Sequence, residues 1–490
     1  FTVILILCYH SKSFFLVNHQ IYRYNHFMKR TLVISTPENV GKSILLKGWV
    51  NSVRGHGKLV FFDLRDRSGL VQVIAENLDV VLKPEYVIAV TGKVVKRPGK
   101  LANDKLETGQ VEIQAKKIDI ITQSKELPIP VTGDGHDINE EMRMKYRYLD
   151  LRRPRMNRNI KTRSKTVKFI RDYLTNHDFV EIETPILTKT TPEGARDFLV
   201  PSRLQAGKFY ALPQSPQQYK QLLMVAGFER YFQFAKCFRD EDPRADRAYG
   251  EFTQLDIEMS FVTQEDILQL TEKMFTSLVK EIFPEKKIQQ TPWPRISHSE
   301  AQKKYGSDKP DLRKDKKDPN ELAFAWTLDF PLFNKQSKED YFHGSGNAQF
   351  APSHHMFTSP HPDDVHLLDK DPLKVRGLQH DLVLNGFEVG GGSIRIHDSK
   401  VQEKIFELIG FTKEQKQEFT HMLTAFQYGV PPHGGIAPGI DRLLMVLYGE
   451  PNLREVMAFP TISSGQTAVL NAPSIPTPEQ LKELHLKSIK

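Results

Sequence analysis

The sequence predicts an α+β protein with two parts: a small β-barrel near the N-terminus and a larger domain built on an antiparallel sheet flanked by helices. Three observations predict this. Short apolar strands, punctuated by Gly, Asn and Pro, follow one another between residues 45 and 121. A segment rich in Pro, Gly and Asp comes next, LPIPVTGDGHDINEE. Beyond it, helix-forming stretches alternate with strands, two of which read as one long hairpin.

Composition limits the class of protein. The chain has 490 residues, 26% charged and 39% hydrophobic, which is typical of a soluble globular protein of two or three domains. Its two cysteines, Cys8 and Cys237, exclude a disulfide framework and a Cys-rich zinc site, so we expect a reducing, cytoplasmic location. A net charge of +8 favours a polyanionic partner without identifying it, and no stretch predicts a transmembrane helix.

The first 27 residues differ from the rest. They contain no acidic residue, and their apolar run FTVILILC is too short to span a bilayer. No small-residue cleavage pattern follows it, which argues against a signal peptide. We therefore expect residues 1–27 to be a non-native upstream extension and the protein to start at Met28.

Residues 28–125 are predicted to form the barrel. The strand-like segments LLKGWVNSV, KLVFFDLRD, LVQVIA, YVIAVTGKVV and VEIQAKKIDII suggest a five-stranded OB-fold, a frequent binder of single-stranded nucleic acid. Alternation in KLVFFDLRD puts Val60, Phe62 and Leu64 on one face. Phe61 then lies on the polar face, where it suits stacking on an unpaired base; coverage by a loop is an equally good interpretation.

Residues 126–142 are predicted to be a linker, and residues 143–490 the larger domain. A basic helical stretch leads into the strand FVEIETPILTKT, and the polar loop TPEGARDFLVPSR after it suits a lid. Within this loop, the carboxylate of Glu193 could hold an α-ammonium group. Gln217 and Lys220 are three residues apart, so they share one face of the next helix, although a solvated amphipathic helix explains this pair as well.

The hairpin is predicted from the strands 231–239 and 251–259, joined by the charged tip DEDPRADRAYG. Gln254, Asp256 and Glu258 alternate with apolar residues, so one face of the second strand is acidic and amide only. Arg239 ends the first strand beside Glu241, and two more arginines lie in the tip. Guanidinium groups beside carboxylates suit a polyanion held with a metal or an amino group, whereas the plain alternative is a solvated surface hairpin.

Residues 354–397 hold a second polar cluster. Asp381 and Glu388, seven apart on adjoining strand segments, suit Mg²⁺ shared with phosphates; the histidines nearby lack the spacing of a zinc site. Strict alternation puts Glu388 and Arg395 on opposite faces of a strand, and a one-residue bulge at the glycines 390–392 would bring them to one pocket. The planar fork of Arg395 suits bidentate binding of a carboxylate.

These segments resemble a known family. The spelling FRDEDPRADR followed by EFTQLDIE is similar to motif 2 of class II aminoacyl-tRNA synthetases, in the form found in bacterial-type aspartyl-tRNA synthetases. The helix leading to FVEIETP resembles motif 1, and GIAPGIDR resembles motif 3. Together the three motifs cover nearly everything from 140 to 475 in order and spacing.

The resemblance implies ATP-dependent attachment of L-aspartate to tRNA(Asp) through an aspartyl-adenylate, with Mg²⁺, in a homodimer with no membrane contact. It implies catalytic roles for Arg239, Glu388 and Arg442. It implies an aspartate pocket of Glu193, Gln217, Lys220, Arg239, His354 and Arg395. It implies ATP contacts from Arg239, Asp240, Glu241, Glu388, Gly439, Ile440, Asp441 and Arg442, and Mg²⁺ ligands Asp381 and Glu388. By the same resemblance, Arg54, Phe61 and Gln72 would read the anticodon.

Two departures from the family pattern stand out. Bacterial members carry an inserted domain where this chain has only a short loop near 311–321, so any tRNA contact made by that insert is lost. After RADR the chain has Ala248, Tyr249 and Gly250, one residue longer than the usual Gln-Pro, so we assign no ATP contact there. Two alternatives stay open: a relaxed enzyme that also charges tRNA(Asn), and a non-catalytic RNA-binding paralogue.

Overall fold

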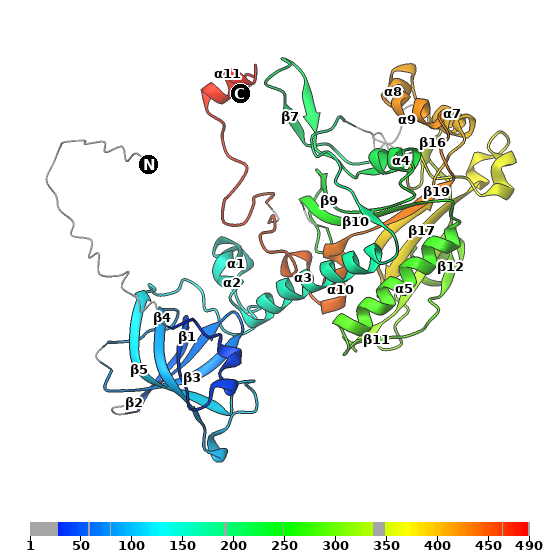
Figure 1. Cartoon of the computed structure of the whole chain (residues 1–490). Coiled ribbons are helices and arrows are strands. Elements are labelled where there is room, and N and C mark those ends of the chain that lie inside the picture. Colours follow the sequence, from blue (N-terminus) through cyan, green and yellow to red (C-terminus); the bar gives the residue numbers. More distant parts are fainter. Residues whose placement is uncertain are drawn as a thin grey trace. The chain divides into compact units, whose positions relative to one another are not determined.

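The protein is described by a computed structural model that divides into two compact units, one ending at Pro128 and the other beginning at Ile129 (Figure 1). The structure describes residues 28–56, 59–78, 80–190, 194–247, 249–336, 348–462 and 464–488. The predictions for residues 1–27 and for Glu193 concern residues outside these described ranges.

The first unit is a closed five-stranded barrel, which confirms the predicted OB-fold. Its strands follow the order β1-β2-β3-β5-β4 around the barrel, with one parallel pair, β3 and β5. Their bounds are β1 Ser43–His56, β2 Leu59–Asp66, β3 Gly69–Glu76, β4 Val87–Lys96 and β5 Val111–Thr122.

Alternation along β2 separates the barrel's core from its outer face. Phe62 and Leu64 are fully buried among the apolar side chains of the other strands, and Val60 packs against the same core. Phe61 is half-buried and shares the outer face with Asp63 and Arg65. The period of two in the sequence therefore places an aromatic ring on the polar side of the barrel, as predicted.

The second unit is built on an eight-stranded sheet of order β12-β14-β17-β18-β19-β10-β9-β6. The six central strands are antiparallel, but β12 pairs with β14, and β6 with β9, in parallel, so the sheet is mixed at both edges. The strands are β6 Val180–Glu181, β9 Arg230–Arg239, β10 Gly250–Ser260, β12 Arg295–Ser297, β14 Phe324–Pro331, β17 Arg376–Leu384, β18 Phe387–Ile394 and β19 His433–Pro438. Shorter pairs are β7 Leu199–Pro201 with β8 Phe209–Ala211, β11 Lys287–Ile288 with β13 Glu321–Leu322, and β15 Phe333–Lys335 with β16 Phe350–Pro352.

One group of helices shares its core with the sheet: α3 Pro154–Thr175, α5 Gln264–Ile282 and α10 Ile440–Tyr448 (Figure 1). A capping box of Thr263 and Asp266 starts α5. The amphipathic pattern of residues 264–290 predicts a single helix over that whole range, but the helix ends at Ile282, so the prediction is wrong for residues 283–290. Phe283 precedes Pro284, and a residue before proline is driven out of the helical region.

A second group surrounds a separate apolar core: α4 Gln217–Val225, α7 Ser399–Leu408 and α9 Thr420–Phe426. The short helix α8 Lys413–Glu418 lies between α7 and α9 in the chain and has no buried residue. The remaining helices are α1 Glu140–Lys145, α2 Arg147–Asp150, α6 His298–Tyr305 and α11 Pro478–Glu483. Within the described ranges, none of these helices combines the length and the apolar character that crossing a bilayer requires.

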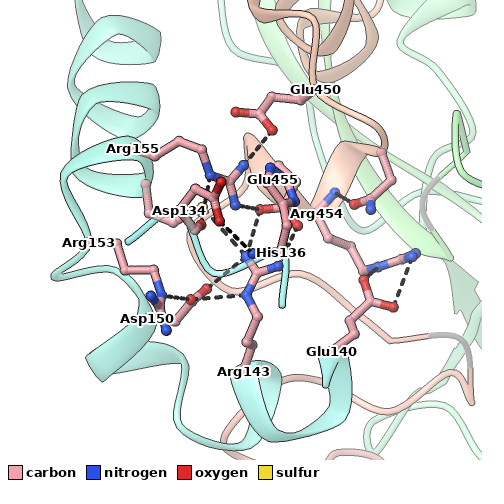
Figure 2. A network of polar contacts seen from close by, with 12 residues as sticks. Asp134, His136, Glu140, Arg143, Asp150, Arg153, Arg155, Glu450, Arg454 and Glu455 are labelled. Carbon is pink, nitrogen blue, oxygen red and sulfur yellow. Dashed lines mark hydrogen bonds and ion pairs between the residues drawn. The ribbon is translucent and has the colours of Figure 1, made fainter. Parts of the chain in front are cut away.

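A buried network of ion pairs holds α1, α2 and the start of α3 against a segment near the C-terminus (Figure 2). Asp150 accepts hydrogen bonds from three guanidinium groups, and Glu455 pairs with two at 2.7 Å. We call this the Asp150–Glu455 network; it consists of Arg143, Arg147, Arg153, Arg155, Asp150 and Glu455. It fixes the position of the chain as it enters the second unit.

Candidate functional site

A cavity of about 310 Å³ opens over strands β9, β10, β18 and β19, beside the first turns of α4 and α10. Most of the residues singled out in the second unit line it: Gln217, Lys220, Arg239, Glu241, His354, Glu388, Arg395, Gly439, Asp441 and Arg442. They come from segments more than 200 residues apart, and the sheet brings them together.

The hairpin supplies the central wall. Strands β9 and β10 pair from Arg239 opposite Gly250 to Arg230 opposite Met259, so both predicted strands lie within one residue of their observed bounds. Phe252, Gln254 and Asp256 alternate along β10 and line the cavity. The acidic and amide face of this strand is therefore turned toward the cavity rather than toward bulk solvent.

Four buried charges lie at the inner end of the cavity, and we call them the floor cluster: Lys220, Asp256, Glu258 and Arg395. The ammonium of Lys220 lies 2.8 Å from Asp256 Oδ1 and 3.4 Å from Glu258 Oε2. Arg395 Nε lies 3.0 Å from Glu258 Oε1, while its Nη1 donates to Ser393 at 2.7 Å. The second oxygen of Asp256 is buried and has no hydrogen-bond partner among the described residues.

The floor cluster is arranged so that the carboxylate of Glu258 stays ionised. Burial alone would raise the pKa of Glu258, but the charges of Arg395 and Lys220 bring this pKa below its ordinary value. Two cations are thereby kept in a site with little water, although each is partly neutralised. Such a site suits an anionic group that can approach both cations.

A bulge in β18 brings Glu388 and Arg395 to the same cavity. Gly391 pairs with Asp381 and Gly390 with Leu382, but Glu388 pairs with Val383, so one extra residue is accommodated at Val389. The predicted one-residue bulge is present, but it lies at Val389, immediately before the glycines rather than within them. The glycines after it allow close approach, because a Cβ on Gly392 would lie 2.1 Å from the carbonyl oxygen of Gly435.

The cavity also contains a half-buried, neutral histidine. Burial, and then the charges of Arg395, Arg239 and Lys220, lower the pKa of His354 to about 3. His354 therefore carries no charge at neutral pH and can offer both a donor and an acceptor.

Two arginines line the outer part of the cavity. The guanidinium of Arg239 lies over the ring of Phe252, 5.1 Å from its centre, and Arg442 donates to the carbonyls of Glu388 at 2.7 Å and Asp246 at 3.0 Å. These contacts fix both guanidinium groups, and neither group has a carboxylate as its main partner. Two such arginines facing one cavity suit a polyphosphate.

Asp381 and Glu388 form a close acidic pair. A Cβ on Gly391 would lie 3.2 Å from Asp381 Oδ1 and 3.6 Å from Glu388 Oε1. Burial, and then the negative charge of Glu388, raise the pKa of Asp381 well above its ordinary range. The described residues contain no group of three or more His, Cys, Asp or Glu side chains that could hold a metal ion. The pair therefore fits a cation only where other oxygens complete its coordination.

Some of the predicted residues have other partners. Asp240 lies beside Arg196, with 3.6 Å between the charged atoms, and does not line the cavity. The side chain of Ile440 is fully buried in the core. Asp441 accepts from the backbone of Thr253 and from Arg163, so it joins α10 to β10 and α3.

Sequence reasoning missed Phe252, Ser215 and Asp246, which also line the cavity. Phe252 could have been found, because it lies two residues before Gln254 and hence on the same face of β10. The insertion after Arg247 positions Tyr249 outside the cavity; its ring meets Phe198 edge-on and packs against Gly465.

On the barrel, the three predicted base-reading residues lie on adjoining strands. Arg54 of β1 is the cross-strand partner of Phe61 in β2, and Gln72 of β3 is the partner of Asp63. Gln72 accepts a hydrogen bond from Arg97 at 2.8 Å and donates one to Glu112 at 3.1 Å. The outer face of the barrel therefore combines an aromatic ring with oriented polar groups, which suits unpaired bases.

Comparison with known proteins adds independent support. Residues 139–463 match the family of tRNA synthetases class II (D, K and N), and residues 44–121 match the OB-fold nucleic acid binding domain. The chain is 39% identical to the "Aspartate--tRNA(Asp/Asn) ligase" of Thermoanaerobacter pseudethanolicus, over 94% of this chain and 98% of the relative. It is 40% identical to the protein of the same name from Rubrobacter xylanophilus, over 91% and 95%.

Solved structures show the same fold at lower identity. The aspartyl-tRNA synthetase of Entamoeba histolytica superimposes with a TM-score of 0.69 at 22% identity, covering 94% of this chain and 98% of that chain. The asparaginyl-tRNA synthetase of Pyrococcus horikoshii, complexed with asparaginyl-adenylate, gives 0.68 at 23% identity, covering 86% and 96%. With its barrel, its hairpin and its cavity, the chain belongs to the class II tRNA synthetases of the D, K and N group, and it is similar in sequence to bacterial aspartate–tRNA(Asp/Asn) ligases.

Proposed function

We propose that this chain attaches L-aspartate to tRNA in two steps. ATP activates aspartate as an aspartyl-adenylate, and the aspartyl group is then transferred to the 3′ end of the tRNA with release of AMP. The names of its relatives support the substrate. The single observation that carries the proposal is the buried fork of Arg395, held by Glu258 and Ser393 beside Lys220 in a cavity large enough for a small ligand. A fixed guanidinium next to an ammonium matches the side-chain carboxylate of aspartate.

In the first step, the aspartate α-carboxylate attacks the α-phosphate of ATP. A bond forms between the carboxylate oxygen and the phosphorus, the bond to the β-phosphate oxygen breaks, and pyrophosphate leaves. Arg239 neutralises charge at the α-phosphate, and Arg442 binds the γ-phosphate. Catalysis comes from positioning and from fixed charge rather than from a covalent enzyme intermediate.

The floor cluster selects aspartate over asparagine. The carboxylate of aspartate accepts from Arg395 and Lys220, while Gln217, Glu193 and His354 bind the rest of the amino acid. An asparagine amide would turn hydrogen-bond donors toward these cations, which leaves both with a poorer partner.

We propose Mg²⁺ as the second cofactor, held by Asp381 and Glu388. Asp381 is buried and Glu388 half-buried, and a bound cation would relieve the repulsion between their carboxylates, with phosphate oxygens to complete its coordination. When bound, the ion supplies charge compensation to the phosphates. The remaining ATP contacts proposed are those of Glu241, Asp441 and the backbone from Gly439 to Arg442, with Asp240 the weakest of the set because it faces Arg196.

We propose that the barrel, residues 28–125, binds the anticodon through Arg54, Phe61 and Gln72. Residues 126–142 are then the linker and 143–490 the catalytic domain. A second candidate function, charging of tRNA(Asn) as well as tRNA(Asp), is favoured by the Asp/Asn designation of the relatives. In that case the barrel tolerates more than one anticodon, and an amidotransferase must process the product.

The bacterial insertion domain is proposed to be reduced to the loop near 311–321. The alignment with the Thermoanaerobacter protein runs over 598 positions, whereas 94% of the 490 residues is about 460. Roughly 140 positions of the alignment therefore hold no residue of this chain, which is about the size of one small domain.

We further propose a cytoplasmic homodimer. Apolar side chains at and after the edge strand β6 support this, because Val180, Ile186 and Leu187 are about half exposed. Sedimentation velocity tests it: a species of twice the chain mass is expected, and a monomer at micromolar concentration would contradict it.

The test of the function is aminoacylation by the chain from Met28 onward, with separate transcripts of tRNA(Asp) and tRNA(Asn). Charging of the first alone supports the discriminating enzyme, and comparable charging of both supports the relaxed one. Pyrophosphate exchange without charging would indicate that tRNA docking needs the missing insert. Loss of both activities would contradict the function and favour the non-catalytic paralogue.

A further inference from the structure

Three buried polar side chains form a hydrogen-bonded chain behind the cavity. The side-chain nitrogen of Gln217 donates to Gln221 Oε1 at 3.0 Å. The side-chain nitrogen of Gln221 lies 3.1 Å from His433 Nε2, and His433 Nδ1 lies 2.9 Å from the carbonyl oxygen of Pro431. The exposed fractions are 5% for Gln217 and zero for Gln221 and His433, so no bulk water substitutes for a partner.

The chemistry of the last link fixes the direction of the whole chain. A carbonyl oxygen only accepts hydrogen bonds, so Nδ1 of His433 must carry the proton. Burial lowers the pKa of His433, so the ring is neutral and its Nε2 must accept. Gln221 therefore donates to His433 through its nitrogen and has its oxygen left to accept from Gln217.

This direction decides which end of the Gln217 amide is available to a ligand. Its nitrogen is committed to Gln221, and the side chain lines the cavity, so its oxygen is the end left for a ligand. An amide oxygen attracts an ammonium group, whereas an amide nitrogen with its two hydrogens would repel it.

We propose that Gln221 and His433 are positioning residues that hold the Gln217 oxygen toward the α-ammonium group of the bound amino acid. The inference rests on the proposed function, which supplies an amino acid as the ligand. His433 also couples this end of the pocket to the other, because its carbonyl oxygen accepts from the backbone N–H of Arg395 at 2.9 Å. One residue thus supports both the ammonium end and the carboxylate end of the site.

A role in core packing alone would give the same buried contacts, so the test compares two substitutions that differ in hydrogen bonding. Gln221→Met keeps length and volume but removes the acceptor for Gln217. Gln221→Glu keeps an acceptor for Gln217 and forces His433 to take a second proton. Gln218→Met is the matched control, because Gln218 precedes Gln221 on α4 and its side-chain oxygen contacts His421 instead.

The probes are L-aspartate, as substrate in ATP–pyrophosphate exchange, and succinate, which lacks the amino group, as competitive inhibitor. For Gln221→Met we expect the KM for aspartate to rise roughly fivefold while the Ki of succinate changes less than about twofold. For Gln221→Glu and Gln218→Met, the ratio of succinate Ki to aspartate KM should stay near that of the unaltered enzyme. Equal shifts for both ligands, or a Glu variant that discriminates less than the Met variant, would overturn the proposal.

The tautomer gives a second measurement, which is made on the unaltered protein and uses a variant only to assign the signals. In protein labelled with ¹⁵N-histidine, the resonances of His433 should show a neutral ring protonated at Nδ1; a ring protonated at Nε2 alone would overturn the proposal. The His433→Gln variant assigns these signals among the 17 histidines. If the unaltered enzyme shows no aspartate-dependent exchange, the proposed function fails, and this is a different result from exchange with unchanged discrimination.

Discussion

The second unit contains two buried clusters of opposite charges, the Asp150–Glu455 network and the floor cluster, and they are satisfied to different degrees. In the network, Asp150 receives bonds to both oxygens from three arginines (Figure 2). Arg147 and Arg153 also donate to backbone carbonyls, and Arg143 also donates to Glu455. In the floor cluster, one oxygen of Asp256 has no partner among the described residues, and the cations border a cavity.

This difference indicates that the Asp150–Glu455 network stabilises the fold, whereas the floor cluster binds a ligand. Burying a charge is costly unless partners surround it, so the network is complete in the free protein and loses stability if one member is removed. The floor cluster leaves part of this requirement unmet until a ligand arrives. A buried charge cluster with an open side is therefore the better candidate for a binding site.

Removing the centre of the network should have the largest effect. Asp150→Asn leaves the fully buried Arg147 and Arg153 without their carboxylate. We expect the free energy of unfolding, measured by urea denaturation, to fall by about 5 kcal/mol. A loss below about 1 kcal/mol would contradict the role given to the network.

Altering the floor cluster should affect activity more than stability. Arg395→Lys keeps the charge beside Glu258 but loses the fork that binds a carboxylate at two points. We expect kcat/KM for aspartate in pyrophosphate exchange to fall roughly a hundredfold, about 3 kcal/mol. Unchanged kcat/KM would exclude Arg395 from the aspartate pocket.

The network should also make stability depend on acid pH. Burial raises the pKa of Glu455, but its bond with Arg143 and the charges of Arg143 and Arg155 lower it to about 2, from 4.5. A lowered pKa in the folded state stabilises the protein above about pH 4.5, and this contribution is lost as the pH falls toward 2. The difference in unfolding free energy between the unaltered protein and Glu455→Gln should therefore shrink by about 2 kcal/mol from pH 7 to pH 3. A difference that is constant with pH would contradict this.

The smallest effect is expected where an ion pair is exposed. Asp172 pairs with Lys168 on α3, and their side chains are 54% and 75% exposed. Asp172→Asn should change the free energy of unfolding by about 0.5 kcal/mol or less. It is the control for Asp150→Asn, and a comparable loss in both variants would mean that burial does not govern these pairs.

Much of the site could be predicted from the sequence, because apolar and polar residues alternate along a strand and thereby show which side chains share a face of the sheet. The hairpin bounds, the barrel strands and the bulge that joins Glu388 to Arg395 all follow from local spacing. The Asp150–Glu455 network does not, since Arg143 and Glu455 are 312 positions apart and look like ordinary surface charges in the sequence. The direction of the hydrogen bonds from Gln217 through Gln221 to His433 cannot be predicted from local spacing either, because it depends on the backbone carbonyl of Pro431.

The most direct test of the account is calorimetric titration of a nonhydrolysable sulfamoyl analogue of aspartyl-adenylate into three proteins at pH 7: the unaltered chain, Arg395→Lys and Glu455→Gln. The account predicts that Arg395→Lys weakens binding roughly a hundredfold, while Glu455→Gln binds within about twofold of the unaltered chain despite its lower stability. Equal weakening in both variants would contradict the assignment of ligand binding to the floor cluster and of stability to the Asp150–Glu455 network.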